Sequence, residues 1–351
     1  MHPDIFMKDL NLKNACTLIC FILASVTSGC SQSNSETGAS TVNNLIHKTG
    51  YLTCELGSIP EFVKYGKGKH TLLLIPGLGF NATVFDDFIK INNNNFKMYA
   101  ITIPGYGNTK APPMPDAGTS YGEQSWNKGV CDGIARLIEK EKIKKLIVVG
   151  HFVQGTQLAL QIAINQPNII EGVIILGGPA KYITIINGEP KEFPLKGTIS
   201  YVDKITAPTW FQSIKKEDFD EGNYSAEIYS LQDEVGHELW KQSAAVSLPV
   251  MIRYLCEFFS ADVRLDLNKV KCPVLVLRAM FNEKVLQDPI NNYVKPQFID
   301  SWEGTSSINS LIEVRDIHNA ASFVWKDQPD EVYSAIKTFL SDKKKFPSTK
   351  K

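Results

Sequence analysis

Several short segments of this chain have a residue flanked by glycines, the pattern that places a catalytic nucleophile on a tight turn. In the pattern Gly-x-Ser-x-Gly, a serine on a sharp strand-to-helix turn attacks a carbonyl carbon after a histidine removes its proton. The segment Gly118–Gly122 (GTSYG) has this spelling, but it follows a proline-rich loop with no strand before it. The segment Gly129–Gly133 (GVCDG) has a cysteine at its centre, yet it lies inside a predicted amphipathic helix from Glu123 to Glu139. We therefore expect a nucleophile in neither segment.

The strand-turn-helix context occurs instead at Lys144–Leu160 (KKLIVVGHFVQGTQLAL). An apolar run predicts a strand over 146–149, and apolar residues at helical spacing predict a helix that begins at Thr156. On the common form Gly-His-Ser-x-Gly-Gly, the corner has Phe152 at the nucleophile position and Gln154 where a small residue allows close packing. The frame of the corner is therefore present without a hydroxyl, and the bulk of Gln154 predicts a relaxed backbone there.

Strands and helices alternate along most of the chain. Apolar runs predict strands at 71–75, 98–103, 172–176, 272–279 and 311–317, after a hairpin at 51–56 and 61–65. This alternation predicts an α/β fold, with a mainly parallel sheet and helices on both faces. The alternation stops between 180 and 262, where many aromatic residues at partly helical spacing predict an inserted helical cap.

From about Gly50 to Leu340, the order of elements and loops resembles the α/β-hydrolase superfamily. The loop Pro76–Phe80 is similar to the oxyanion loop of a secreted subgroup that is spelled Ile-Pro-Gly-Leu, and Pro273–Leu277 matches the seventh strand. The resemblance implies the α/β-hydrolase fold with an eight-stranded sheet. It also assigns the two oxyanion-hole amides to Leu78 and Val153.

A serine hydrolase of this fold needs a nucleophile, a carboxylate and a histidine in that chain order. The resemblance places the nucleophile at Phe152. It places the acid at Asn282, counted from Pro273, and the histidine at Ser322, counted back from Pro329. All three positions of the triad are therefore changed.

A shifted acid and base are an alternative. His318 stands four residues before Ser322 in the same loop, and Glu283 follows Asn282. We favour a structural role for His318, as a loop histidine that hydrogen-bonds backbone groups. No replacement nucleophile is visible at the corner.

The first thirty residues have the pattern of an exported protein. Lys8 and Lys13 precede an apolar run that is too short to span a membrane and ends in Thr27–Cys30 (TSGC). This segment resembles a bacterial lipoprotein signal peptide, which implies cleavage before Cys30, lipidation of its thiol and an anchored location in the cell envelope. We expect a signal peptide at 1–29, a flexible tether at 30–47, the α/β-hydrolase domain at 48–345 with its cap at about 180–262, and a basic tail at 346–351.

The charge balance and the cysteine spacing limit the kinds of partner and cofactor to expect. The 37 Lys and Arg residues balance the 37 Asp and Glu residues, so charge gives no reason to expect a nucleic-acid partner. The later cysteines have no paired spacing, so we expect no metal site, cofactor or disulfide framework.

Two functions are consistent with these features of the sequence. We favour a lipid-anchored protein without conventional serine-hydrolase chemistry that binds a small apolar or ester-like molecule, or a partner, over an esterase-like hydrolase that uses non-standard residues such as His318.

Overall fold

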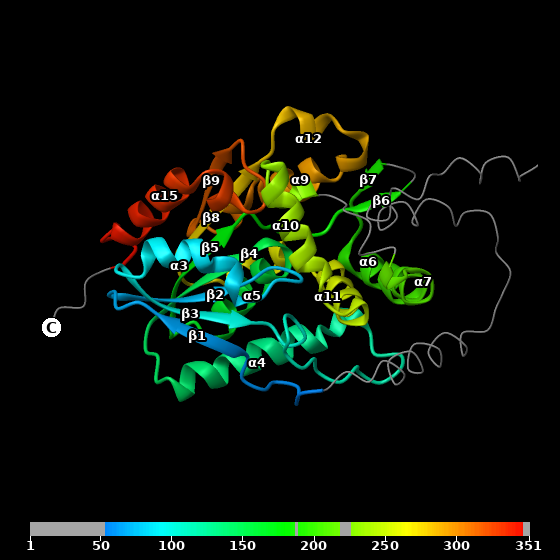
Figure 1. Cartoon of the computed structure of the whole chain (residues 1–351), viewed down its shortest axis with the longest axis horizontal. Coiled ribbons are helices and arrows are strands. Elements are labelled where there is room, and N and C mark those ends of the chain that lie inside the picture. Colours follow the sequence, from blue (N-terminus) through cyan, green and yellow to red (C-terminus); the bar gives the residue numbers. More distant parts are fainter. Residues whose placement is uncertain (1–52, 187–188, 218–225, 347–351) are drawn as a thin grey trace, which may run out of the picture.

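The computed structural model describes residues 53–186, 189–217 and 226–346 (Figure 1). Its centre is a seven-stranded sheet in the order β1-β3-β2-β4-β5-β8-β9. Strand β1 runs antiparallel to β3, and every other pairing in this sheet is parallel. The predicted α/β class and mainly parallel sheet are confirmed, although the sheet has seven strands in the described residues, where eight were expected. The strands are β1 (Glu61–Tyr65), β2 (His70–Ile75), β3 (Phe96–Thr102), β4 (Leu146–His151), β5 (Ile170–Leu176), β8 (Val274–Met280) and β9 (Ile312–His318).

Helices cover both faces of the sheet. Every residue of the central strand β4 is buried as a result. Helix α4 contacts α5, and α3 contacts α15 through the rings of Phe88 and Tyr333, whose centroids are 5.8 Å apart. These helices are α3 (Asp86–Asn92), α4 (Ser125–Lys140), α5 (Phe152–Asn165) and α15 (Pro329–Ser341).

The start of the described chain differs from the predicted hairpin. Over its described residues, the arm expected at 51–56 is not a strand, because Thr53 makes only a single bridge to Ala111. The N–H of Cys54 donates to the carbonyl of Ala111 at 2.9 Å. Gly57 then turns the chain at a φ of 80°, and β1 pairs with β3 instead of with the preceding segment.

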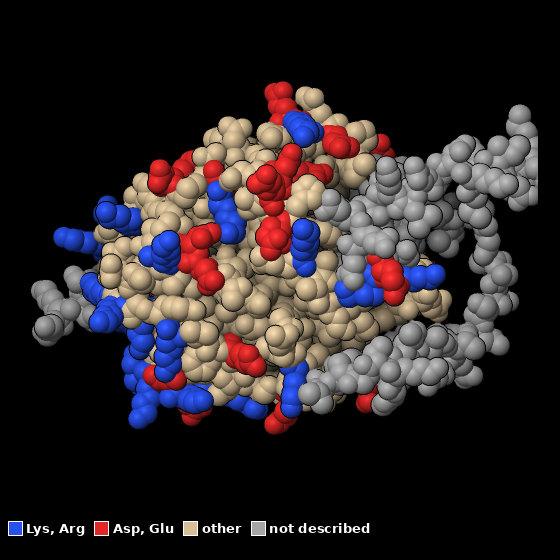
Figure 2. Space-filling view, in the orientation of Figure 1, with Lys and Arg blue, Asp and Glu red and all other residues tan. Residues whose placement is uncertain are grey.

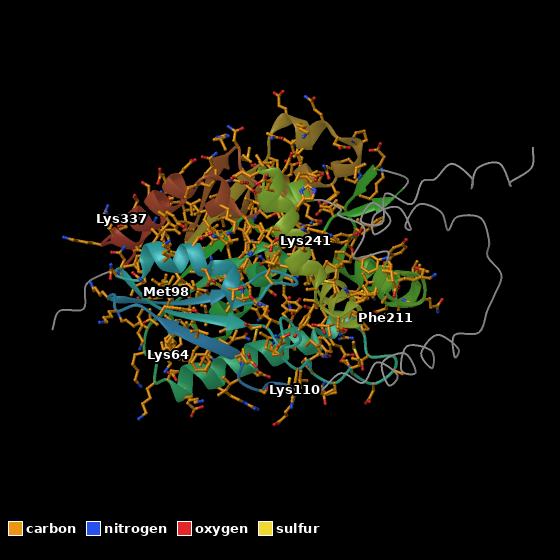
Figure 3. The ribbon with its side chains drawn as sticks, in the orientation of Figure 1. Lys64, Met98, Lys110, Phe211, Lys241 and Lys337 are labelled. Atoms are coloured by element: carbon orange, nitrogen blue, oxygen red, sulfur yellow. The ribbon has the colours of Figure 1, made fainter. Side chains whose placement is uncertain are left out.

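The predicted cap lies between β5 and β8, and Figure 1 shows its helices α6, α7 and α11 at one end of the molecule. It also contains a small hairpin of β6 (Thr184–Ile186) and β7 (Glu189–Lys191), which the sequence pattern did not indicate. Its described helices are α6 (Leu195–Tyr201), α7 (Ala207–Ser213), α9 (Ala226–Tyr229), α10 (Asp233–Ala244) and α11 (Leu248–Phe259). In Figure 3, Phe211 of α7 marks the cap end and Lys64 of β1 lies toward the other end.

A buried carboxylate joins the cap to the core. Glu257 on α11 accepts hydrogen bonds of 2.9 Å from the backbone N–H groups of Trp126 and Asn127, in the first turn of α4. The guanidinium of Arg253 donates to the same carboxylate at 2.6 Å. The first N–H groups of a helix have no partner within the helix, so the negative charge satisfies them and is stabilised by the helix dipole.

The next features are the distribution of charge, the helix lengths, the cysteines and the possible metal ligands. Figure 2 shows Lys and Arg side chains gathered at the end of the molecule away from the cap. In the described ranges, no helix combines the length and the apolar character needed to cross a bilayer. The cysteines of these ranges are free thiols, and no cluster of three potential metal ligands occurs in them. The predicted signal peptide, Cys30 and the tether lie outside the described residues.

Candidate ligand site at the strand-to-helix corner

The corner between β4 and α5 has a left-handed backbone. Strand β4 ends at His151 and α5 begins at Phe152, earlier than the predicted start at Thr156. Phe152 has a φ of 55°, a conformation that costs a residue with a Cβ about 1–2 kcal/mol. The prediction of a relaxed backbone at this corner is therefore wrong.

Two glycines explain why the corner tolerates a bulky residue at 154. A Cβ on Gly155 would lie 2.7 Å from the carbonyl oxygen of Ile75, so the close approach of helix and strand occurs at 155. A Cβ on Gly150 would lie 2.3 Å from the carbonyl oxygen of Gly155. Real Cβ atoms do not come so close to backbone, and these two glycines therefore hold the corner tight.

The Gln154 side chain is buried in a polar network beside the corner. The hydroxyl of Tyr106 donates to Gln154 Oε1 at 2.5 Å, and Gln154 Nε2 donates to Asn127 Oδ1 at 3.1 Å. Burial raises the pKa of the Tyr106 phenol well above its usual range, so the phenol stays protonated and can donate. Gln154 therefore links the core loop that holds Tyr106 to helix α4.

His151 is a neutral ring packed among other rings. It is fully buried, and its centroid lies 4.2 Å from that of Phe323 and 4.8 Å from that of Trp325. Neither ring nitrogen has a hydrogen-bond partner among the described residues. Burial lowers the pKa of His151 well below 6.5, so the imidazole is uncharged at neutral pH.

The ring of Phe152 lines an apolar cavity of about 130 Å³ under the cap. It stacks on Phe298 at a centroid distance of 5.9 Å and lies 5.6 Å from the ring of Tyr229. Leu78 and Val153, the predicted oxyanion-hole residues, line the same cavity. The wall is mostly aromatic, and the lining found among the described residues includes no serine, cysteine, histidine or carboxylate.

The loop that carries Leu78 rests directly on the corner. A Cβ on Gly77 would lie 2.5 Å from Cβ of Phe152 and 3.1 Å from the carbonyl oxygen of His151. Only a glycine allows this approach, so Leu78 is held beside the corner by the residue that precedes it. The structure therefore brings together three of the predicted site residues, at positions 78, 152 and 153.

The other predicted positions do not line this cavity. Asn282 is the N-cap of α12 (Glu283–Gln287), where its Oδ1 accepts from the N–H of Val285 at 3.0 Å. Ser322 is fully buried, and its hydroxyl donates to the carbonyl oxygen of Ile228. His318 is the exposed last residue of β9, and Glu283 is also exposed. None of these groups is placed as an acid or base against the ring of Phe152.

One part of the cavity wall was missed by the sequence analysis. Tyr293, Gln297 and Phe298 come from short turns between β8 and β9, a stretch without helical or strand periodicity. The N–H of Ile183 donates to Gln297 Oε1 at 3.3 Å, which ties these turns to the cap. The available signal was two aromatic residues among scattered aliphatic ones, such as Ile290 and Val294, at irregular spacing.

The strand order, the left-handed corner after β4 and the cap inserted after β5 define an α/β-hydrolase fold. Several solved structures have the same fold. A hydrolase from Oleispira antarctica matches 83% of this chain and 99% of its own with a TM-score of 0.60 at 13% identity. The esterase EaEST from Exiguobacterium antarcticum matches 83% of this chain and 100% of its own with a TM-score of 0.59 at 13% identity. MenH from S. aureus matches 81% of this chain and 98% of its own with a TM-score of 0.54 at 15% identity.

The match found by sequence covers a smaller part of the chain than the structural matches do. A curated pimeloyl-[acyl-carrier protein] methyl ester esterase of Wigglesworthia glossinidia brevipalpis is 31% identical over 111 residues. The alignment covers 32% of this chain and 37% of that protein, so it spans little more than a third of the relative's length. No family model matches the chain. Together with the solved structures, this relative confirms the predicted resemblance to the α/β-hydrolase superfamily.

Proposed function

We propose that this chain is a lipid-anchored α/β-hydrolase-fold protein that binds a small apolar or ester-like molecule in the cavity at Phe152, without conventional serine-hydrolase chemistry. The observation that carries the proposal is the ring of Phe152 at the position where the fold presents its nucleophile, with an apolar cavity of about 130 Å³ beside it. Relatives that are esterases by name support an ester-like ligand, and the lining supports binding without hydrolysis.

The size and chemistry of the cavity limit its ligand. An apolar cavity of about 150 Å³ in another protein stays dry and binds benzene, so a cavity of similar size suits one small ring. Aromatic walls favour an aromatic ligand, because offset and edge-to-face ring pairs add to the gain from burial. We expect a carbonyl oxygen of such a ligand to accept from the N–H groups of Leu78 and Val153.

Methyl benzoate tests this binding directly. The melting temperature of the wild type should rise with its concentration, because a ligand at a hundred times its Kd stabilises the folded state by about 2.7 kcal/mol. Chromatography of the recovered ester should show no benzoate above the protein-free blank. The variant Phe152→Trp should lose the shift, because the larger ring occupies the cavity. The exposed Phe193 provides a matched control, and Phe193→Trp should bind as the wild type does. Turnover of the ester, or no shift in the wild type, would contradict the proposal.

The absence of serine chemistry has its own test. A fluorophosphonate probe should leave the intact mass of the wild type unchanged, and Phe152→Ser alone should stay unlabelled because no base faces it. Combining Phe152→Ser with Asn282→Asp and Ser322→His should also give no activity on a short activated ester, because positions 282 and 322 do not line the cavity at residue 152. Gln154 can stay in this variant, because Gly155 already provides the close approach. Labelling of Phe152→Ser alone would support the alternative in which His318 or another group acts as the base.

The lipid anchor is tested separately in cells. A tagged fatty acid should label the wild type and not Cys30→Ala, and only the wild type should fractionate with membranes. The multiple acyl chains of a processed lipoprotein give stable membrane binding, whereas one chain binds only marginally. Equal labelling of the two proteins would remove the anchor from the proposal and leave the ligand site untouched.

A further inference from the structure

A second cavity, of about 290 Å³, opens beyond the carboxyl end of α11. It lies between α4, α5, α6 and the 3-10 segment Val263–Lys269 (η5). Phe258 and Phe259 of α11 line the cavity at Phe152, whereas Ser260 and Ala261 line this second one. The end of α11 therefore separates the two cavities.

Two buried polar atoms in the lining of this second cavity lack partners. Gln157 is 5% exposed and Ser260 is 2% exposed. Gln157 Oε1 and Ser260 Oγ have no hydrogen-bond partner among the described residues. Leaving a buried polar group unpaired costs about 1–3 kcal/mol, so each such atom needs an explanation, and a ligand that pairs with both is one.

The orientation of the Gln157 amide is fixed by its other end. Gln157 Nε2 donates to the carbonyl oxygen of Phe258 at 3.1 Å, and turning the amide over would set two oxygens against each other. Gln157 Oε1 therefore needs a donor from a ligand. The hydroxyl of Ser260 can donate to an acceptor, while its backbone N–H is already used within α11.

The apolar part of the wall of this cavity is aliphatic, and it stands beside polar side chains that include Gln124, Asn127 and Gln161. The apolar part includes Leu158, Leu160 and Ile164 of α5 together with Leu195 and Ile199 of α6, and among the described lining residues of this cavity there is no aromatic ring. Leu265 also lines it and is 61% exposed, which provides an apolar rim. An aliphatic chain makes good contact with such walls.

The charges at the rim are already paired. Asp262 accepts from Arg264 Nη2 at 2.8 Å, and Asp266 accepts from Lys269 Nζ at 2.6 Å. Lys128 also lines the cavity, but it is exposed. The buried polar groups are neutral, so the lining favours a neutral head group over an ionised one.

We infer that this second cavity is a binding site for a neutral, unbranched aliphatic molecule whose head group both donates and accepts a hydrogen bond, such as a primary amide or an alcohol. The head group donates to Gln157 Oε1 and accepts from Ser260 Oγ, while the chain lies against α5 and α6. The site is separate from the cavity at Phe152 and takes a different class of molecule.

Titration of the full chain with hexanamide, followed by saturation-transfer NMR, tests this site. The wild type should bind hexanamide, and Ser260→Ala should weaken binding about five- to tenfold, the value of one hydrogen bond of about 1 kcal/mol or slightly more. Leu195→Trp should abolish binding by filling the cavity, whereas Lys196→Trp, on the exposed face of the same helix, should bind as the wild type does. Unliganded melting temperatures show that each variant is folded.

Comparison ligands separate this inference from the proposed function. Hexanoate should bind more weakly than hexanamide, and methyl benzoate should not displace hexanamide. Phe152→Trp should leave hexanamide binding unchanged. The inference is overturned if the wild type does not bind hexanamide, if hexanoate binds more tightly, or if Phe152→Trp abolishes binding while Leu195→Trp does not. Each of these outcomes leaves the methyl benzoate result at the first cavity to be judged by itself.

Discussion

The corner after β4 and the loops after β8 and β9 stand at the same edge of the sheet and differ in what they preserve. At the corner the backbone keeps the left-handed Phe152 and close glycines on both sides. In the two loops, Asn282 caps a helix and the Ser322 hydroxyl donates to a backbone carbonyl. The corner thus has a strained, closely packed backbone, whereas the side chains at the two loop positions stabilise local backbone structure.

Packing explains this difference. The corner is where α5, β2 and the Leu78 loop approach most closely, so a change in its backbone would disturb all three. A side chain at position 152 stands in the cavity instead, and a ring can be placed there without moving the backbone. The left-handed φ of Phe152 costs about 1–2 kcal/mol, and burial of the ring offsets it.

The largest effect that would test the importance of the corner is expected from Gly150→Ala. The new Cβ would lie 2.3 Å from the carbonyl oxygen of Gly155 and 2.7 Å from Cβ of Ala159. Because one of these atoms belongs to the backbone, we expect a loss of about 4 kcal/mol, above the usual range for overpacking. Urea unfolding measures it.

Gly197→Ala in α6 is the matched control for that variant. The nearest atom to its new Cβ is Cβ of Phe193 at 4.0 Å, so nothing has to move. Alanine in place of glycine within a helix should stabilise the protein by about 0.5–1 kcal/mol. Equal and small effects of the two substitutions would mean that the corner is not held by close packing.

The next effect concerns the left-handed backbone of Phe152 itself. Phe152→Ala should cost about 3 kcal/mol, at the lower end for a buried phenylalanine because the ring already borders a cavity. Phe152→Gly should cost about 1 kcal/mol less than Phe152→Ala, because glycine adopts this φ without strain. Denaturant unfolding of both variants checks the order. A glycine variant that is less stable than the alanine variant would show that the corner is not left-handed in solution.

A smaller loss is expected from Gln154→Leu. It leaves the buried Tyr106 hydroxyl and Asn127 Oδ1 without this partner, which should cost about 2 kcal/mol. The double variant with Tyr106→Phe should lose less than the sum of the two single losses, because its phenol no longer needs an acceptor. Strictly additive losses in unfolding experiments would show that the two side chains do not interact.

Much of the fold follows from local patterns in the sequence, because buried parallel strands are apolar runs and helices have a period of 3.6 residues. The same patterns located the corner, and the resemblance to α/β-hydrolases placed Leu78, Phe152 and Val153 at one site. They failed where contacts are distant along the chain. Gln154 looked too large for its position because its partners Tyr106 and Asn127 come from other elements. The wall formed by Tyr293 and Phe298 belongs to turns without periodicity, so its position depends on tertiary packing alone.

The smallest expected effect is a pH dependence of stability that comes from the buried His151. The pKa of His151 in the folded protein lies well below 6.5 because the ring is buried, and the nearby charge of Lys326 lowers it further. The unfolded chain takes up a proton at this residue near pH 6.5, whereas the folded protein does not. Stability should therefore fall as the pH drops below 6.5, by about 1.4 kcal/mol for each pH unit from this residue. His151→Phe should remove this part of the slope, because the ring nitrogens have no partners to lose among the described residues and the surroundings are aromatic. Urea unfolding of both proteins between pH 7.5 and pH 5.5 measures the difference, in which the titration of all other groups cancels. Parallel curves for the two proteins would show that His151 is protonated equally in both states and is not buried as a neutral ring.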